Sequence, residues 1–197
     1  MMKLNSARAA WHDSLYTARD SQGAVMQEMG LLGRMIQKTE RSTNARHAAH
    51  QAVAGRVQQA MDTLPASLRA FGNWMYSPIA SVDEKEEAEE LVFLVAYKTG
   101  PKMYAKKFEK ARFVAAGVLY RYRRMHQGGQ SEGVDPCPTP ESFRVWLGAI
   151  YGLELQSTQW TREWGEFIDS CFAACNDLDK SALAPISNTL KTMKMAA

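Results

Sequence analysis

The chain has 197 residues, of which 46% are hydrophobic, so it is long enough to bury a core of its own. Its formal net charge of +3 is mildly basic, and its three cysteines, without a recognisable secretory signal, favour a reducing, cytoplasmic compartment. No apolar run approaches the roughly 18 residues that a membrane span needs, so the composition argues against membrane and disulfide-stapled secreted proteins.

The charge is distributed unevenly along the chain. Residues 101–127 contain eight Lys and Arg residues and one acid, whereas residues 61–100 contain three basic and seven acidic residues. A mildly basic protein therefore contains one strongly basic block, which is a feature of surfaces that bind phosphate groups.

Residues 1–64 are rich in Ala, Gln and Arg and are predicted to form a helical N-terminal extension. Breaks between helices are expected near Gly23, Gly30, Gly33 and residues 42–44. The rest of the chain is predicted to form a helical core over residues 65–180 and a loosely ordered tail over residues 181–197. The sequence contains no internal repeat and no convincing strand, so the predicted fold class is all-α.

Two helices are expected at the start of this core. Apolar residues recur at helical spacing between Pro65 and Pro78, which predicts a short amphipathic helix. Ser81 followed by Glu84 is a capping-box pattern, and it predicts the start of a helix that ends near Thr99.

The basic block is predicted to form one helix over residues 102–125, with an apolar stripe that includes Tyr104. Its cations are candidate contacts to a nucleic-acid backbone: Lys102, Lys106, Lys107, Lys110, Arg121, Arg123 and Arg124. Two alternatives involve no ligand. In the first, the arginines lie at a solvated helix end, where cations are favoured. In the second, the block pairs its charges with the acids of residues 83–90.

Residues 140–176 are predicted to form a helix-turn-helix. The first helix carries Phe143, Leu147 and Ile150 on one face and ends at Gly152 in a left-handed cap. Ser157 or Thr158 is expected to cap the second helix, whose apolar stripe runs from Trp160 to Cys175. Residues near the start of this second helix, with one from the first, are the candidate DNA contacts: Ser157, Thr158, Gln159, Thr161, Arg162 and Arg144.

This pair of helices also has a purely structural interpretation. Two amphipathic helices joined by a turn occur in most all-α proteins, and most of those proteins bind no DNA. The turn from Gly152 to Thr158 is also longer than the three or four residues of a standard helix-turn-helix.

No catalytic or metal-binding pattern stands out. His47 and His50 have no third ligand near them in the sequence, and Cys137 is isolated between two prolines. Cys171 and Cys175 share an apolar stripe, so they are predicted to be buried thiols. We therefore expect no catalytic residue, no metal, no cofactor and no small-molecule substrate.

Residues from about 85 to 178 resemble the lambdoid phage Q antitermination proteins at the level of pattern. The resemblance is carried by the segment from Pro140 to Trp160, by Phe167–Asp169 and Cys175, and by the Ala-rich aromatic helix from Phe113 to Arg124. Many of those proteins carry Cys-x-x-Cys zinc modules between the central helix and the helix-turn-helix. Here residues 127–139 contain one cysteine, so the chain is similar to zinc-less, prophage-derived lysis regulators of the family and no metal is expected.

The resemblance implies a factor that works in a bacterial or phage-infected cell. Such a factor binds a double-stranded DNA element near a late promoter, loads onto RNA polymerase paused downstream, near σ region 4, and promotes readthrough of pauses and terminators. Nascent RNA is a further candidate partner. Two alternatives remain open from the residues: a dimeric helix-turn-helix repressor or activator, and a phage-type inhibitor that binds a host complex.

Overall fold

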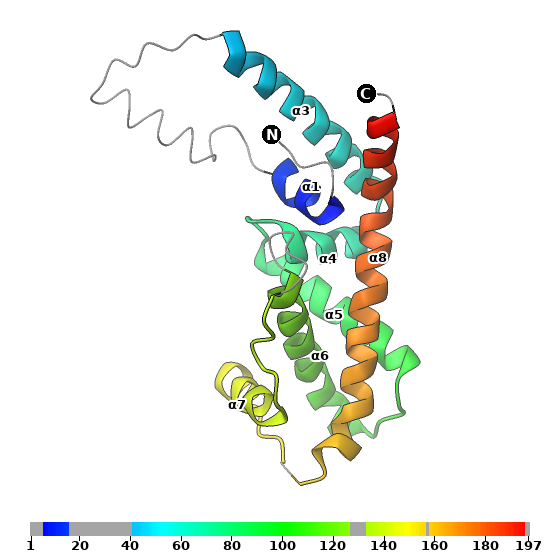
Figure 1. Cartoon of the computed structure of the whole chain (residues 1–197). Coiled ribbons are helices and arrows are strands. Elements are labelled where there is room, and N and C mark those ends of the chain that lie inside the picture. Colours follow the sequence, from blue (N-terminus) through cyan, green and yellow to red (C-terminus); the bar gives the residue numbers. More distant parts are fainter. Residues whose placement is uncertain (1–5, 16–40, 127–132, 157, 196–197) are drawn as a thin grey trace, which may run out of the picture.

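The computed structural model describes residues 6–15, 41–126, 133–156 and 158–195, and all regular structure within these ranges is helical (Figure 1). The all-α prediction is confirmed. In chain order the helices are α1 (Ala7–Ser14), α3 (Arg41–Asp62), α4 (Ala66–Tyr76), α5 (Val82–Thr99), α6 (Ala105–His126), α7 (Pro140–Tyr151), the π-helical turn η2 (Thr161–Gly165) and α8 (Glu166–Met195).

The longest of these helices, α8, organises the others. It runs along one side of the molecule, and α1, α3, α4, α5 and α6 all pack against it (Figure 1). The remaining α-helix, α7, packs against α6 instead. A single hydrophobic cluster joins these helices, and it includes Phe71 of α4, Phe93 of α5, Leu119 of α6 and Phe167 of α8.

Local signals fix several helix ends, two of them, at Ser81 and Gly152, as the sequence predicts. The Ser81 hydroxyl accepts from the Glu84 backbone N–H and the Glu84 carboxylate accepts from the Ser81 N–H, so the predicted capping box begins α5. At α7, Thr139 and Ser142 cap the first turn and Pro140 occupies its first position. Gly152 ends α7 with a φ of 63°, as predicted for a left-handed cap.

The N-terminal segment contributes to the common core. Trp11 of α1 and Val57 of α3 are fully buried, and both belong to the same cluster as the helices that follow. The break expected at residues 42–44 is wrong, because α3 is continuous from Arg41; polar residues do not interrupt a helix whose later turns are packed. The breaks expected at Gly23, Gly30 and Gly33 lie outside the described residues.

The predicted loose tail is also wrong, because α8 continues to Met195. Ala182, Ile186 and Leu190 are buried, so they extend the helical spacing of the buried stripe beyond Cys175. Pro185 lies inside the helix; it removes one backbone donor, but the packed residues on both sides of it keep the helix continuous.

Two residues assigned to apolar faces are exposed. Tyr104 precedes the first turn of α6 and is 70% exposed, so it lies outside the stripe that was expected to include it. Ile150 is 57% exposed because α7 packs on α6 through Phe143 and Leu147, which are buried. These two side chains approach Gly117 of α6 so closely that a Cβ atom there would lie 2.7 Å from the Phe143 ring.

Candidate nucleic-acid interface

The lysines at the start of α6 lie against the turn that follows α7. Lys107 Nζ donates to the Glu163 carbonyl and lies 5.0 Å from the centroid of the Trp164 ring. Lys110 Nζ donates to the Glu154 carbonyl at 3.3 Å. The two segments are about 50 residues apart in the sequence, so the fold brings together two groups that were predicted separately.

Buried aromatic rings anchor this turn to the core of the protein. Trp160 and Trp164 are buried, and Trp160 lies edge-on to Phe143 of α7 with the ring centroids 6.2 Å apart. Gln159 adopts a left-handed backbone with a φ of 66°, and the next residues form the π-helical turn η2, a feature often found at functional sites. Thr158, Gln159, Thr161 and Arg162 are exposed outside this aromatic anchor.

The start of the second helix differs from the prediction. The residue that precedes η2 is Trp160, it makes no side-chain capping bond, and Thr158 lies in the turn before it. The expected cap at Thr158 is therefore wrong, because the chain needs two further residues to bring Trp160 into the core. Ser157 lies outside the described residues. Helix α7 packs on α6. This packing does not establish a helix-turn-helix, which stays a prediction.

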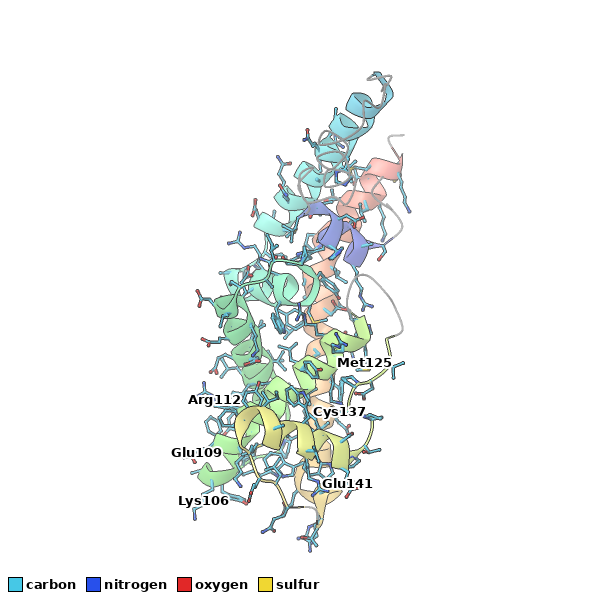
Figure 2. All side chains as sticks on the ribbon, turned by 90° about the vertical axis from the view of Figure 1, so that its left-hand side faces the viewer. Lys106, Glu109, Arg112, Met125, Cys137 and Glu141 are labelled. Atoms are coloured by element: carbon cyan, nitrogen blue, oxygen red, sulfur yellow. The ribbon has the colours of Figure 1, made fainter. Side chains whose placement is uncertain are left out.

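We define the α6–η2 surface as the lysines at the N-terminal end of α6 together with the exposed residues of the turn and η2. Figure 2 shows Lys106 at the same end of the molecule as α7 and η2, with Glu109 and Arg112 further along α6. The surface consists of Lys102, Lys106, Lys107, Lys110, Thr158, Gln159, Thr161 and Arg162. Exposed carboxylates of Glu109, Glu154 and Glu163 lie among these cations, so the positive charge is interrupted rather than continuous.

The other predicted contacts lie elsewhere. Arg121 makes two hydrogen bonds to Asp135, at 3.1 and 2.6 Å, and its guanidinium lies 5.0 Å from the ring centroids of both Phe143 and Phe172. It thereby joins the loop before α7 to α7 and α8. Burial raises the pKa of Asp135, but hydrogen bonds from Arg121 and from the Cys137 N–H outweigh this effect, so the net pKa is lowered.

Arg123 and Arg124 also stand apart from the α6–η2 surface, and Arg144 is engaged within α7. Arg144 pairs with Glu141 one turn earlier in α7, at 3.2 Å. Arg123 and Arg124 lie thirteen or more residues after Lys110 on the same helix, which corresponds to about 20 Å at 1.5 Å per residue. The seven cations predicted in residues 102–125 therefore do not form one continuous surface.

A buried polar network was not predicted. Asp179 of α8 is 3% exposed; Arg8 of α1 donates to its Oδ2 at 2.6 Å, Tyr122 of α6 donates to the same oxygen at 3.2 Å, and Tyr76 of α4 donates to its Oδ1. Burial first, and then the Asp179 charge, raise the pKa of both tyrosines, so both hydroxyls remain donors at neutral pH. Arg8 Nη1 also lies 3.1 Å from His126 Nδ1.

One member of this network, Asp179, can be recognised from its position in the sequence. Asp179 follows Cys171 and Cys175 at the same four-residue spacing, so a charged residue occupies the buried face of α8. A buried charge needs a partner, and the sequence alone does not say which residue supplies it. Here three other helices, α1, α4 and α6, supply the partners, so the network fixes α1 to the core.

The two cysteines of α8 are buried, and their surroundings bear on whether the protein could hold a metal ion. Cys171 and Cys175 are buried as predicted, and burial raises the pKa of both thiols. In the part of the chain that the structure describes, no group of three His, Cys, Asp or Glu side chains could hold a metal ion. Within the same ranges, no helix combines the length and apolar character needed to cross a membrane.

Comparisons with known proteins add no relative. No protein family, no curated protein and no solved structure matches this chain. The structure alone defines the class, which is an all-α protein. In it the lysines at the start of α6 lie beside a turn that buried aromatic rings anchor.

Proposed function

We propose that this protein binds double-stranded DNA through the α6–η2 surface and acts as a transcription antitermination factor of the phage Q type. The observation that carries the proposal is the contact of Lys107 and Lys110 with the turn and η2. This contact supports a single binding surface, in which lysines can neutralise phosphates while Gln159 and Arg162 reach base edges.

The charge pattern sets what this surface can do. Acids lie among the lysines, so non-specific attraction to DNA is modest and the protein needs a specific element to accumulate at a promoter. A factor with this balance would depend on its DNA element for loading and on protein contacts afterwards. The resemblance to Q proteins supplies the second half of this proposal, with RNA polymerase and σ region 4 as partners.

Replacing Lys102, Lys106 and Lys110 by Gln should weaken binding to any DNA duplex by a similar factor. The slope of log K against log salt should become shallower by about 2 to 3, since up to three fewer counterions are released on binding. Fluorescence anisotropy at several salt concentrations measures this slope. The matched control replaces Lys98, Lys180 and Lys191, which are exposed on α5 and α8. If both triple variants have the slope of the parent, the lysines of α6 do not contact DNA.

Antitermination is tested by transcription in vitro with bacterial RNA polymerase. The template carries a promoter, a DNA element selected by the protein from a random pool, and a terminator several hundred base pairs downstream. We expect the protein to increase readthrough only when the element is present, because the loaded factor travels with polymerase. Arg162→Ala should reduce loading, with specific DNA binding weaker by roughly 1–3 kcal/mol, and excess protein should restore readthrough in part.

The alternatives give different results in the same assay. A repressor or activator changes the number of initiated transcripts and leaves the fraction that passes the terminator unchanged. An inhibitor of a host complex acts equally on templates with and without the element. Either result would replace antitermination as the proposed function.

A further inference from the structure

Arg123 is a half-buried cation that has no carboxylate partner among the residues that the structure describes. Its guanidinium carbon lies 3.8 Å from the centroid of the Trp74 ring, and its Nε atom is buried without a hydrogen-bond partner in the described residues. Burial and the neighbouring charge of Arg124 both lower its pKa, which is the direction expected when no carboxylate compensates the charge. Leaving such a group unpaired costs free energy.

The other half-buried arginines that the structure describes each have a carboxylate partner, although the Arg144 Nε atom is also buried without a hydrogen-bond partner. Arg8 donates to Asp179, Arg121 to Asp135 and Arg144 to Glu141. Arg112 and Arg121 of α6 also lie over aromatic rings, and each pairs with a carboxylate, Glu90 and Asp135 respectively. Arg123 departs from this pattern, although it lies only two residues after Arg121 on the same helix.

We propose that Arg123, supported by the Trp74 ring, binds a phosphate group, either as inorganic phosphate or as a phosphate monoester. A guanidinium stacked on an aromatic face keeps its edge available, and that edge matches two phosphate oxygens. Lys85 Nζ lies 6.0 Å from the centroid of the same ring, so a second cation lies near the site. Inorganic phosphate and a nucleotide are both candidate ligands, because both present the phosphate oxygens that the guanidinium would bind.

The surrounding charges favour a compact dianion. Arg123 and Lys85 together carry two positive charges, although Lys85 also contacts Glu89 at 3.6 Å. The exposed acids at the start of α5, including Asp83, Glu86 and Glu87, would repel a long polyanion that continued past the site. The inference does not rest on DNA binding, because about 20 Å of helix separates Arg123 from Lys110.

The test follows the indole N–H signal of Trp74 by NMR in the full-length protein, with the signal assigned through Trp74→Phe. Inorganic phosphate is titrated at constant ionic strength, and a nucleoside monophosphate is titrated in parallel. We expect a saturable shift with a dissociation constant of roughly 1 mM or below. In Arg123→Gln the affinity should fall by about tenfold or more, and Arg123→Lys should also bind more weakly because it keeps the charge and loses the fork. Circular dichroism establishes that both variants are folded.

Arg112→Gln is the matched control, because it removes an arginine of the same helix that already has a counter-ion. It should bind phosphate as the parent does. Equal affinity for phosphate and nucleotide supports a site for the phosphate group alone, and tighter nucleotide binding supports a site that also contacts the sugar or base. A shift that does not saturate, or that persists unchanged in Arg123→Gln, overturns the proposal. Neither result depends on DNA, so this test can fail while the proposed function stands.

Discussion

Asp179→Ala should lower the free energy of unfolding by about 3–5 kcal/mol, because it removes the acceptor shared by two buried donors and one half-buried donor. Arg8 would lose its ion pair, and the hydroxyls of Tyr76 and Tyr122 would lose their common carboxylate. Tyr122 retains one acceptor, Asn176 Oδ1 at 3.1 Å. Guanidinium chloride unfolding followed by circular dichroism measures the change.

Asp177→Ala is the control for this prediction. Asp177 lies two residues earlier on α8, its side chain is 76% exposed, and it pairs with an equally exposed Lys180 at 3.7 Å. Exposed pairs of this kind contribute about 0–1 kcal/mol. If both aspartates cost the same, the network does not fix α1 to the core as the structure indicates. Adding Tyr76→Phe and Tyr122→Phe to Asp179→Ala should recover part of the loss, because apolar rings need no acceptor.

The fold was largely predictable because its helices obey local rules. The capping box at Ser81, the left-handed Gly152 and the stripe from Trp160 to Cys175 depend on residues within one or two turns of each other. The continuation of α8 past Pro185 was also visible in the spacing of Ala182, Ile186 and Leu190. The prediction of a loosely ordered tail was wrong because the buried stripe continues through Pro185 toward the end of α8.

The candidate site was less predictable because it depends on tertiary contacts. The basic residues of α6 share one block of sequence, but a helix turns them toward different neighbours: Lys107 toward η2, Arg121 toward Asp135 and Arg123 toward Trp74. No pattern within the block distinguishes these three environments. The contact of the α6 lysines with the turn after α7 likewise joins segments about 50 residues apart.

The packing of α1 against α4 also depends on a tertiary contact, between Trp11 and Gly72. A Cβ atom at Gly72 would lie 2.0–2.7 Å from three carbons of the fully buried Trp11 indole, whose Nε1 donates to Asn73 at 3.1 Å. Glycine inside a helix is otherwise unfavourable, by about 1 kcal/mol relative to alanine. Its presence in α4 is explained by the space that the indole requires.

Gly72→Ala should therefore destabilise the protein by about 1–3 kcal/mol, the usual cost of overpacking a core, despite the better helix propensity of alanine. Gly55→Ala is the control. Gly55 lies in the interior of α3 with no atom within 4 Å of its Cβ position, so this variant should gain up to about 1 kcal/mol. Thermal unfolding of the two variants against the parent separates propensity from packing. A double-mutant cycle with Trp11→Leu completes the test, because the smaller side chain should make Gly72→Ala far less costly. If Gly72→Ala stabilises the protein as Gly55→Ala does, the indole of Trp11 does not occupy the face of α4, and α1 must be attached by its other contacts, among them the Arg8–Asp179 pair.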